Sequence, residues 1–580
     1  MRKNILIFLI FLFIFTTFVY SDLKTNPPKG FLSAIRKLSQ EEVKQIFLLD
    51  RIGQFILEIP KDEPKPSLTE KDNEKGYCLF IRDYTIEVYP NSAPREKEII
   101  RDGEEIEIYV SKGEYEPVAI GIYPLKDLKG VNVKVSELIG KNGKIGSENI
   151  EVFLVDYQII GRKPLYRIWP GVLTKDKDMS MNKEETWRYW IRVYVPKDIK
   201  EGEYRGKIEF ICDNAPKTEI NLKLNVYPFV LPENTDVSFG VYGSFVRGEE
   251  GIKDQKEHGI NGVDMGCDWK LEDGKVLITN LDQLNKNVEL IKKYNMKGPH
   301  QIIPTYNKFL SSPEYDRAYI EAVKQIWEWA KKQGIEVIIW PTDEPRETRE
   351  DFWRLNFDEL KHLLELYKNM PEVKTLVTFT GDAVSQKGND YSEVVPLLNI
   401  VCIHANKPIP QFRLVQAALK NNKEIWLYNS GNFRYSWGLG TWKWNAKGRW
   451  EWEYPPAPPG EPLWWPGMYN LTYSPVGKTS KVNPEPRPIW EIAREGIDDY
   501  KYVYLLQTLI KQYENDIQKK QIVEKAKTYL KELKDKLPEV ATRVQYSSID
   551  AADRIDTFGK PEELNEVRRT IGNFITQLIK

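Results

Sequence analysis

Hydrophobic and polar positions follow three successive patterns along the chain, and the first predicts β-structure. From Tyr77 to about residue 233, short runs of alternating apolar and polar residues are separated by turn residues at fairly even spacing. Such runs are typical of a β-sandwich. The expected strands are Ile81–Tyr89, Ile106–Val110, Pro117–Tyr123, Val131–Val135, Ile150–Val155, Trp187–Val195, Lys207–Cys212 and Ile220–Val226.

From Val237 onward the pattern changes to strand-like runs that alternate with helical ones. Helical spacing is clear at Tyr315–Lys332 and at Arg349–Tyr367. Eight strands with helical spacers predict a (β/α)8 barrel. The expected barrel strands are Val237–Tyr242, Gly262–Cys267, His300–Pro304, Glu336–Trp340, Thr375–Thr380, Ile400–His404, Glu424–Tyr428 and Arg449–Tyr454.

The third pattern is helical and fills the C-terminal end of the chain. A long helix is expected at Pro488–Gln512, followed by Lys- and Glu-rich helices at 517–536 and 561–579, which we expect to form a solvated tail. The fold class is therefore multidomain, with a β-sandwich, a TIM-like barrel and a helical tail. The expected domains are a signal peptide at 1–21, a helical segment and linker at 22–76, the sandwich at 77–233, the barrel at 234–512 and the tail at 513–580.

The N-terminus has the pattern of an export signal. Arg2 and Lys3 precede an apolar run from Ile5 to Val19, and small or β-branched residues follow. A spanning helix needs about 20 apolar residues, so this run favours a cleaved signal peptide over a membrane anchor. We expect cleavage near Ser21 and a secreted, periplasmic or cell-surface protein.

Composition and charge narrow the function classes. The formal net charge of the 580 residues is −1, which gives no electrostatic reason to expect nucleic acid as a partner. The four cysteines lack metal-ligand spacing, so we expect no zinc site, no disulfide framework and no cofactor. The 17 Trp and 31 Tyr can build cores and also sugar-binding surfaces, so the composition is compatible with a glycan as partner.

The sharpest chemical signal is the adjacent pair Asp343 and Glu344, which directly follows the fourth expected barrel strand. Barrel enzymes place their chemistry at the C-terminal ends of strands. Carboxylates before a proline such as Pro345 also often cap a helix start. The apolar strand and Trp340, which precede the pair, favour the catalytic interpretation.

Two neighbouring carboxyl groups do not easily lie on opposite sides of a sugar ring, as ordinary glycosidases require. The seventh strand ends in Trp426, Tyr428 and Asn429 and carries no carboxylate nucleophile. The pair instead suits substrate assistance, in which a 2-acetamido oxygen of the sugar attacks the anomeric carbon. Asp343 would orient the acetamido N–H, and Glu344 would be the acid and base with a raised pKa.

The chain resembles glycoside hydrolase family 123 and the wider group that shares its C-terminal catalytic domain. The resemblance spans most of the chain after about residue 77. Its motifs are Pro341–Pro345, Ile425–Asn429 with Gly438 and Trp442, Arg494–Tyr500, Lys112–Pro117 and Glu201–Gly206. It implies an N-acetyl-β-galactosaminidase-like hydrolase that retains configuration by neighbouring-group participation, with Asp343 and Glu344 matching the catalytic pair of the family.

Further residues near the expected strand ends are candidates for substrate contacts, although each residue type there also has an ordinary structural role. The candidates are Trp340, Trp426, Tyr428, Asn429, His404, Asp268 and Glu451. Two alternatives remain open. Glu344 can act with a carboxylate from another strand, Glu451 or Glu453, or the chain can be a non-catalytic carbohydrate-binding surface protein.

Overall fold

The structure is a computed structural model, and the part of the chain that it describes begins at Ile56. The described residues are 56–58, 60, 62–162, 165–175, 178–245, 248–346, 352–380, 388–404, 412–431, 434–452, 454, 472–473, 485–538 and 560–580. The expected signal peptide, residues 22–55 of the expected helical segment and linker, and Glu453 lie outside these residues.

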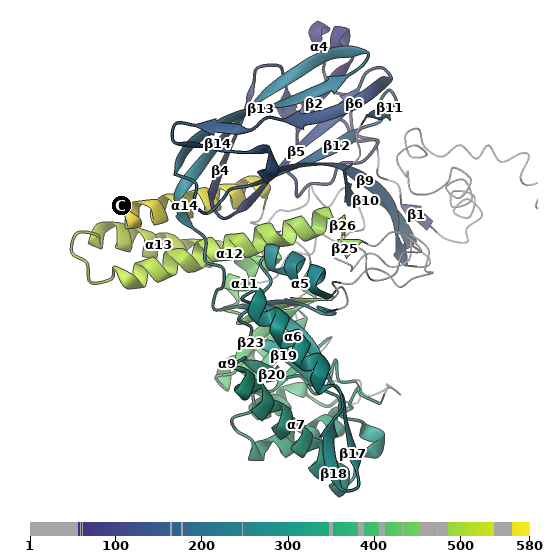
Figure 1. Ribbon diagram of the computed structural model, residues 1–580, viewed down its shortest axis with the longest axis vertical. Helices are drawn as coiled ribbons and strands as arrows, with labels where there is room; N and C mark the ends of the chain where they lie inside the picture. The colour runs from purple at the N-terminus through teal and green to yellow at the C-terminus, as the bar shows by residue number, and fades with distance from the viewer. Residues whose placement is uncertain are drawn as a thin grey trace, which may run out of the picture.

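Two seven-stranded sheets occupy the N-terminal half and share one core (Figure 1). The first has the order β1-β10-β9-β12-β5-β2-β3. The second has the path β11-β6-β13-β14-β4, with β7 and β8 beside β13. Their bounds are β1 Ile56–Glu58, β2 Tyr77–Ile81, β3 Ile99–Ile100, β4 Glu105–Lys112, β5 Tyr115–Pro124, β6 Leu128–Val135, β7 Leu138–Gly140, β8 Gly143–Ile145, β9 Ile150–Arg162, β10 Leu165–Thr174, β11 Met179–Met181, β12 Trp187–Tyr194, β13 Gly202–Cys212 and β14 Ala215–Val230.

The first strand expected from the sequence, Ile81–Tyr89, is not formed. The strand β2 ends at Ile81, and residues 82–89 form a loop rather than the expected strand. Arg188 explains this, because its guanidinium donates to the carbonyl oxygens of Asp83 at 2.7 Å and Ile86 at 2.6 Å. These bonds satisfy carbonyl groups that would otherwise need a partner strand.

Eight parallel strands form the second half, in the order β20-β19-β16-β15-β24-β23-β22-β21. The strands are β15 Ser238–Val241, β16 Gly262–Cys267, β19 His300–Pro304, β20 Val337–Ile339, β21 Leu376–Phe379, β22 Ile400–His404, β23 Glu424–Tyr428 and β24 Gly448–Glu451. Each lies within or overlaps the strand expected from the sequence. Single bridges at Ile339–Thr375 and Asp343–Thr378 join the two edge strands, so the barrel is nearly closed.

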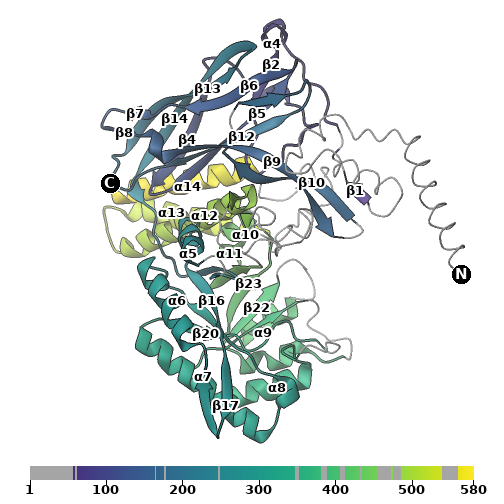
Figure 2. The ribbon, with the colours of Figure 1, turned by 45° about the vertical axis from the view of Figure 1, so that its right-hand side comes forward.

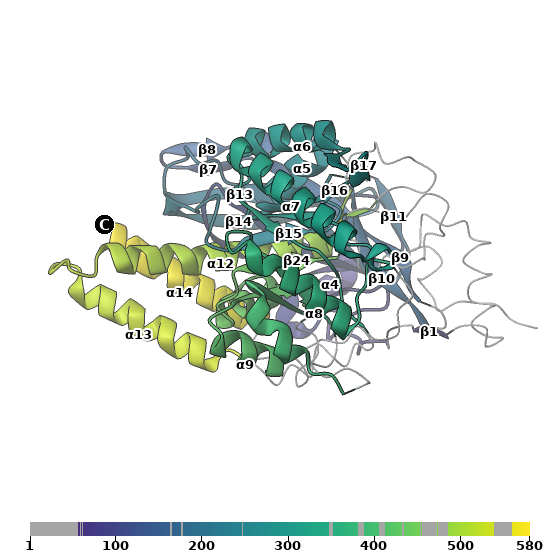
Figure 3. The ribbon, with the colours of Figure 1, turned by 90° about the horizontal axis from the view of Figure 1, so that it is seen from below.

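Helices follow the barrel strands and surround the sheet (Figures 2 and 3). They are α5 Gly248–Glu257, α6 Leu281–Lys293, α7 Pro313–Gln333, α8 Phe357–Leu366, α9 Phe412–Lys420, α10 Arg434–Trp437, α11 Leu439–Lys443 and α12 Pro488–Gln512. A 3-10 helix, η5 Tyr391–Leu397, takes the place of an α-helix after β21. The expected helix at 349–367 begins only at Phe357, where Asn356 caps it.

Shorter elements complete the described chain. A hairpin of β17 Trp269–Glu272 and β18 Lys275–Ile278 follows β16, and β25 Thr472–Tyr473 pairs with β26 Glu485–Pro486. The others are α4 Glu70–Lys75, η1 Glu96–Glu98, η2 Ser147–Asn149, η3 Lys308–Leu310, η4 Tyr367–Asn369, α13 Lys520–Lys536 and α14 Pro561–Ile579. Among the described helices, none is long and apolar enough to span a bilayer.

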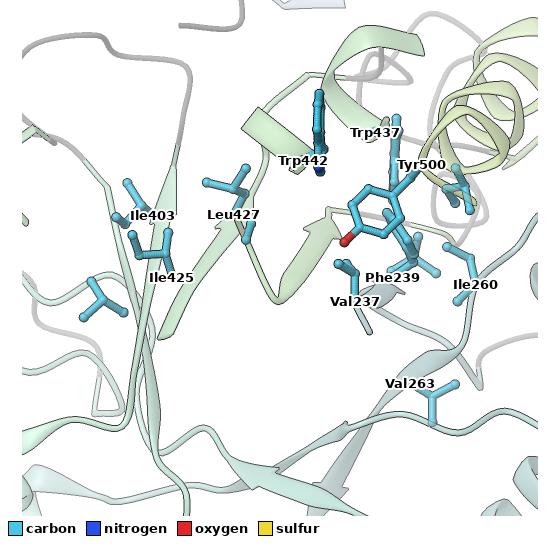
Figure 4. Close-up of a cluster of buried hydrophobic side chains, with 14 of the residues drawn as sticks. Val237, Phe239, Ile260, Val263, Ile403, Ile425, Leu427, Trp437, Trp442 and Tyr500 are labelled. Carbon is cyan, nitrogen blue, oxygen red and sulfur yellow. The ribbon is translucent and has the colours of Figure 1, made fainter. Parts of the chain in front are cut away.

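The barrel strands alternate between two cores. Side chains such as Ile403, Ile425 and Leu427 point outward, into a cluster that Trp437 and Tyr500 complete (Figure 4). Their neighbours point inward and form a separate cluster of Tyr242, Ile338, Trp340, Leu376, Ile400, Cys402, Trp426, Tyr428 and Trp450. This alternation follows from the two-residue period of a strand, and it fixes which residues can reach the mouth of the barrel.

The C-terminal helices join the two halves of the molecule (Figure 1). The long helix α12 contacts β10 and α14, and α14 contacts β14. Val567, Ile571 and Ile575 of α14 are buried in the cluster on the outer face of the barrel. The expectation of a solvated tail is therefore wrong for α14, whose apolar face packs against both halves.

Candidate active site

Asp343 and Glu344 lie where β20 and β21 meet at the C-terminal edge of the barrel sheet. Thr378 of β21 contacts both residues. Its hydroxyl donates to Oδ1 of Asp343 at 2.6 Å, and its carbonyl accepts the backbone N–H of Glu344 at 3.2 Å. The pair is thus anchored to the neighbouring strand rather than exposed on a free loop.

Glu344 has a left-handed backbone conformation with φ of 45°, which is uncommon for a residue with a side chain. Consecutive side chains on an extended strand point to opposite faces. The left-handed residue breaks this alternation, so that both carboxyl groups reach the inner face. The strained turn before Pro345 is therefore what lets an adjacent pair share one site.

Each carboxylate of the pair has its own arginine. The Nη2 of Arg354 donates to Oδ2 of Asp343 at 3.3 Å, and the Nη2 of Arg346 donates to Oε2 of Glu344 at 3.2 Å. The Arg346 side chain is 43 % exposed and also donates to Thr380 at 2.7 Å. The two cations stabilise the ionised forms of the pair, because an opposite charge nearby favours the charged carboxylate.

The surroundings affect the pKa of the two carboxyl groups differently. Burial raises the pKa of Asp343, but the Thr378 hydroxyl and Arg354 oppose this rise. Burial also raises the pKa of Glu344, and there the negative charge of Asp343 adds to the rise. The surroundings therefore favour ionisation of Asp343 more than ionisation of Glu344.

Tyr428 ends β23 on the inner face and reaches the pair directly. Its hydroxyl donates to Oε1 of Glu344 at 3.2 Å. The ring of His404, from the neighbouring strand, lies edge-on to Tyr428 with 5.2 Å between ring centroids. The structure thus brings two of the expected substrate-contact residues together beside Glu344.

Asn429 has a positioning role at the end of β23. Its backbone N–H donates to the carbonyl of Trp450 at 3.0 Å, and its Oδ1 accepts the backbone N–H of Trp452 at 2.8 Å. These bonds hold Trp452, which is 48 % exposed and lies 5.9 Å from the ring of Tyr242. An exposed indole beside the ring of Tyr242 is a suitable surface for stacking a pyranose ring.

The other two expected tryptophans lie deeper. Trp340 is 8 % exposed and packs against Tyr242, with 5.0 Å between ring centroids. Trp426 is fully buried and stacks on Trp450 at 6.3 Å, so it packs the barrel interior below Tyr428. Trp426 presents no surface to a substrate.

Asp268 and Glu451 are not brought to the pair. Asp268 is exposed at the base of the hairpin β17–β18, where its backbone bonds Thr279 and Asn280. Glu451 is buried on the outer face of β24, where its Oε2 accepts from Arg449 at 2.6 Å. Strand alternation explains this position, because Trp450 between them points inward.

Residues that the sequence did not single out complete the site. Thr378 lies on the neighbouring strand β21 and Thr380 directly follows it, and Arg346 and Arg354 come after the pair in the sequence. The hydroxyl of Thr342 donates to the carbonyl of Trp353 at 2.9 Å, which holds the segment carrying Arg354 against the pair. The alternation of side chains along β21 predicts that Thr378 is a polar residue on the inner face of the barrel. No sequence pattern predicts that Arg346 and Arg354 contact the carboxylate pair.

Within the described residues, no group of three or more His, Cys, Asp or Glu side chains is arranged to hold a metal ion. Asp264 of β16 is a further acid on the inner face, and its carboxylate accepts the backbone N–H groups of Gly243 at 3.1 Å and Ser244 at 2.9 Å. The groups in contact at the pair are the two carboxyl groups, the guanidinium groups of Arg346 and Arg354, and the hydroxyls of Thr378 and Tyr428.

Comparisons with known proteins identify the fold. No family model matches the sequence, and no curated protein matches it. The structure is similar to that of a family 123 glycoside hydrolase from Clostridium perfringens, with a TM-score of 0.64 and 14 % sequence identity. The match covers 87 % of this chain and 99 % of that one. The resemblance to family 123 expected from the sequence is confirmed at the level of the fold.

Two further similar structures are also glycoside hydrolases. One is a family 39 enzyme from Bacteroides cellulosilyticus WH2, with a TM-score of 0.33, 12 % identity, and coverage of 64 % of this chain and 81 % of that one. The other is a xyloglucanase from Bacteroides ovatus in complex with a heptasaccharide, with a TM-score of 0.29, 11 % identity, and coverage of 68 % and 98 %.

Proposed function

We propose that the chain is an exported glycoside hydrolase that removes terminal β-linked 2-acetamido sugars by substrate-assisted, retaining catalysis. The observation that carries the proposal is the unequal pair at the barrel mouth. Thr378 and Arg354 both favour the ionised form of Asp343 against the effect of its burial, and the charge of Asp343 raises the pKa of the adjacent Glu344. The family 123 fold likeness supports a sugar substrate.

In the first step, the carbonyl oxygen of the 2-acetamido group forms a bond to C-1 of the sugar. The bond between C-1 and the glycosidic oxygen breaks, and Glu344 gives its proton to that oxygen. Asp343 accepts a hydrogen bond from the acetamido N–H and stabilises the positive charge of the oxazoline-like intermediate. Each group acts in the protonation state that its surroundings favour.

In the second step, water attacks C-1 from the face that the leaving group vacated. Its proton passes to Glu344, and the bond between C-1 and the acetamido oxygen breaks. The sugar is released with its original β-configuration, and Glu344 regains the proton that it needs for the next cycle. The mechanism requires no carboxylate nucleophile. This fits the C-terminal end of β23, where Trp426 and Tyr428 are followed by Asn429 and none of them is an acid.

The test is hydrolysis of 4-nitrophenyl 2-acetamido-2-deoxy-β-galactoside beside its gluco epimer and the two 2-hydroxyl analogues. We expect cleavage of an acetamido substrate and at least a 100-fold lower kcat/KM for its 2-hydroxyl analogue, because the hydroxyl cannot form the cyclic intermediate. Equal cleavage of both would rule out substrate assistance. Binding of glycans without any cleavage would instead identify a carbohydrate-binding protein.

Export belongs to the same proposal. The basic start, the apolar run Ile5 to Val19 and Ser21 support removal of a signal peptide. Expression of the full chain with N-terminal sequencing of the processed protein tests this. A mature protein that begins after Ser21 agrees with export, whereas a protein that keeps Met1 and stays inside the cell contradicts it.

A further inference from the structure

The two arginines at the carboxylate pair differ in how firmly they are held. The Arg354 side chain is 18 % exposed, and its guanidinium lies 4.5 Å from the ring centroid of Trp353. The Arg346 side chain is 43 % exposed, and its backbone N–H donates to the carbonyl of Leu355 at 2.9 Å. Arg346 is therefore a cation on a fixed stretch of backbone whose side chain meets solvent beside Glu344.

Only one nitrogen of the Arg346 guanidinium is in use. Nη2 donates to Oε2 of Glu344 at 3.2 Å and to the Thr380 hydroxyl at 2.7 Å. Within the part of the chain that the structure describes, Nε and Nη1 make no hydrogen bond, and the Thr380 hydroxyl donates none. Hydrogen bonds between charged partners are usually about 2.7–2.9 Å long, so the bond to Glu344 is a long one. Arg346 and Thr380 thus keep donors that a ligand can use.

The charges at the pair balance only while Glu344 is ionised. Asp343 and Glu344 then carry the negative charges, and Arg346 and Arg354 carry the positive ones. The proposed reaction needs Glu344 protonated, and in that form the four side chains have a surplus of one positive charge. Arg346 cannot remove it by losing a proton. An anion bound at Arg346 restores the balance, whereas a neutral hydroxyl does not.

Arg346 also opposes protonation of Glu344. Burial raises the pKa of Glu344 most, and the charge of Asp343 adds to this rise. Arg346, Arg354 and the Tyr428 hydroxyl lower it. A ligand that draws Arg346 away from Glu344 removes one of these lowering effects. Binding of an anion at Arg346 and of a proton at Glu344 therefore favour each other, because coupling between two sites is reciprocal.

The shape of the guanidinium links these two events. A guanidinium binds an oxyanion at two points through either of two edges, Nε with Nη2 or Nη1 with Nη2. Both edges include Nη2, the nitrogen that is bonded to Glu344. Two-point binding of an oxyanion therefore takes Nη2 from Glu344 at the cost of one long bond. The hydroxyl of Thr380 can rotate to donate to the same oxyanion.

We propose that Arg346, with the Thr380 hydroxyl, binds an oxyanion substituent of the substrate, so that the enzyme acts on glycans with a sulfate ester or a uronic acid carboxylate at the cleaved bond. The sulfate would lie on the terminal 2-acetamido sugar, and the carboxylate on the sugar to which it is linked. This inference rests on the proposed function, because it assigns Arg346 to the substrate of the same site. Binding of the correct substrate then releases Glu344 from Arg346 at the moment when it must hold a proton.

The test compares matched anionic and neutral substrates in the wild type and in Arg346→Gln. The parent substrate is the 4-nitrophenyl 2-acetamido-2-deoxy-β-glycoside, galacto or gluco, that the wild type cleaves faster. One arm compares the parent with its 4-sulfate and 6-sulfate where that hydroxyl exists. The other arm compares disaccharides in which the same sugar is β-linked to glucuronic acid or to glucose. The arm that shows a preference identifies the source of the oxyanion.

We expect the wild type to prefer the anionic member of at least one arm by at least about 10-fold in kcat/KM, the effect of a charge-assisted hydrogen bond. Arg346→Gln should abolish this preference. The ratio within each protein is compared, because the substitution also changes the surroundings of Glu344. A wild type that prefers no anionic substrate, or a preference that Arg346→Gln retains, overturns the proposal.

The pH dependence of kcat separates substrate binding from a merely structural role of Arg346. In the wild type, the alkaline limb should lie at higher pH with the preferred anionic substrate than with its neutral partner, because Arg346 no longer lowers the pKa of Glu344. Arg346→Gln should lose this difference. The control is Arg413→Gln, since Arg413 is 65 % exposed and pairs with Asp390 at 3.4 Å, and it should keep both the preference and the difference. Coincident limbs in the wild type, or an equal loss in the control, overturn the proposal.

The two proposals fail in different ways. A wild type that cleaves no 2-acetamido substrate contradicts the proposed function. Arg346 is then judged by isothermal titration calorimetry with N-acetylgalactosamine, its 4-sulfate and 6-sulfate, glucuronic acid and glucose. Tighter binding of an anionic sugar than of its neutral partner by the wild type, lost in Arg346→Gln, supports the oxyanion site. Equal binding, or no binding of any of these sugars, overturns it.

Discussion

Thr378 donates its hydroxyl hydrogen to Oδ1 of Asp343 at 2.6 Å, across the seam where the barrel closes. The same threonine accepts the backbone N–H of Glu344, so one residue of β21 fixes both members of the pair. The bond favours the ionised form of Asp343, which is the form that can accept the acetamido N–H. One contact thus takes part both in closing the sheet and in favouring the ionised carboxylate.

Replacing Thr378 with valine tests this relationship. Without the hydroxyl, the pKa of Asp343 rises, so a higher pH is needed to ionise it. The acid limb of the kcat/KM profile should therefore move to higher pH, while the alkaline limb, set by Glu344, moves less. Thr375→Val, directly before the same strand, is the control, because its hydroxyl donates to Asn399 at 3.1 Å, away from the pair. An unmoved acid limb in Thr378→Val would contradict the role of Asp343.

The unequal roles of the pair predict different leaving-group effects. Glu344→Gln should lower kcat/KM by about 10³ for substrates with poor leaving groups, and much less for 2,4-dinitrophenyl glycosides, which need no proton. Asp343→Asn should impair both kinds of substrate, because its contact is with the acetamido group. Glu424→Gln, at the opposite end of β23, is the control. Equal, mild losses in both site variants would instead point to a capping role.

The barrel could be predicted from the sequence because a buried parallel strand is a short apolar run, and such runs alternate with amphipathic helices. Asp343 and Glu344 could be predicted because they end such a run. Three features of the site could not be predicted, because they depend on pairing between segments distant in sequence, which no local pattern encodes. They are the left-handed conformation of Glu344, the hydrogen bonds to Thr378 and the contacts with Arg346 and Arg354.

The misplaced candidates show the limit of strand-end reasoning. Glu451 and Trp426 both lie on barrel strands, but the two-residue period places one outward and the other deep inside. Small shifts in register decide such outcomes. The buried role of α14 was also missed, because its charged residues suggested solvent, whereas Arg568 among them is almost fully buried.

Tyr428→Phe removes the hydroxyl that donates to Oε1 of Glu344 at 3.2 Å. That bond lowers the pKa of Glu344, so its loss should move the alkaline limb of kcat/KM to higher pH. Loss of a positioned donor should also lower kcat/KM by about 100-fold. Tyr435→Phe, whose hydroxyl donates to Pro538 at 2.9 Å on the outer side, is the control and should leave both limbs in place. A limb that moves to lower pH in Tyr428→Phe would contradict this assignment.

Gly448→Ala tests the packing of the barrel interior. A methyl group at this position would lie 2.0 Å from the indole of Trp426, so the ring must shift. Overpacking of this kind costs about 1–3 kcal/mol, and displacement of Trp426 should also disturb Tyr428 above it. Gly266→Ala, where an added methyl meets nothing within 4 Å, is the matched control. Equal unfolding free energies for the two variants, measured with urea, would show that the interior is loosely packed.

Of the substitutions considered, replacement of Arg568 in α14 should cause the largest loss of stability. Its guanidinium lies 2.7 Å from Asp499, 2.8 Å from Glu495, 3.1 Å from Glu116 and 3.3 Å from Glu114. Arg568→Met leaves these buried carboxylates without this cation, which should cost about 3–5 kcal/mol. Arg569→Gln, one residue along the helix, removes a surface pair with Glu566 and a cation–π contact with Tyr109, and it should change stability much less.

The Arg568 variant should also respond to pH in a defined direction. Burial raises the pKa of Glu114 from its ordinary 4.5 to about 7, although Arg568 opposes this rise. Between these two pH values the folded state binds more protons than the unfolded state, so stability falls as pH rises. Removing Arg568 raises the pKa of Glu114 and Glu495 further, so the variant should lose most stability near pH 8 and least near pH 5. Urea unfolding of the wild type and of Arg568→Met at about these two pH values measures the difference in stability. A loss of stability that grows toward acid pH would contradict the proposed stabilisation of the buried carboxylates by Arg568.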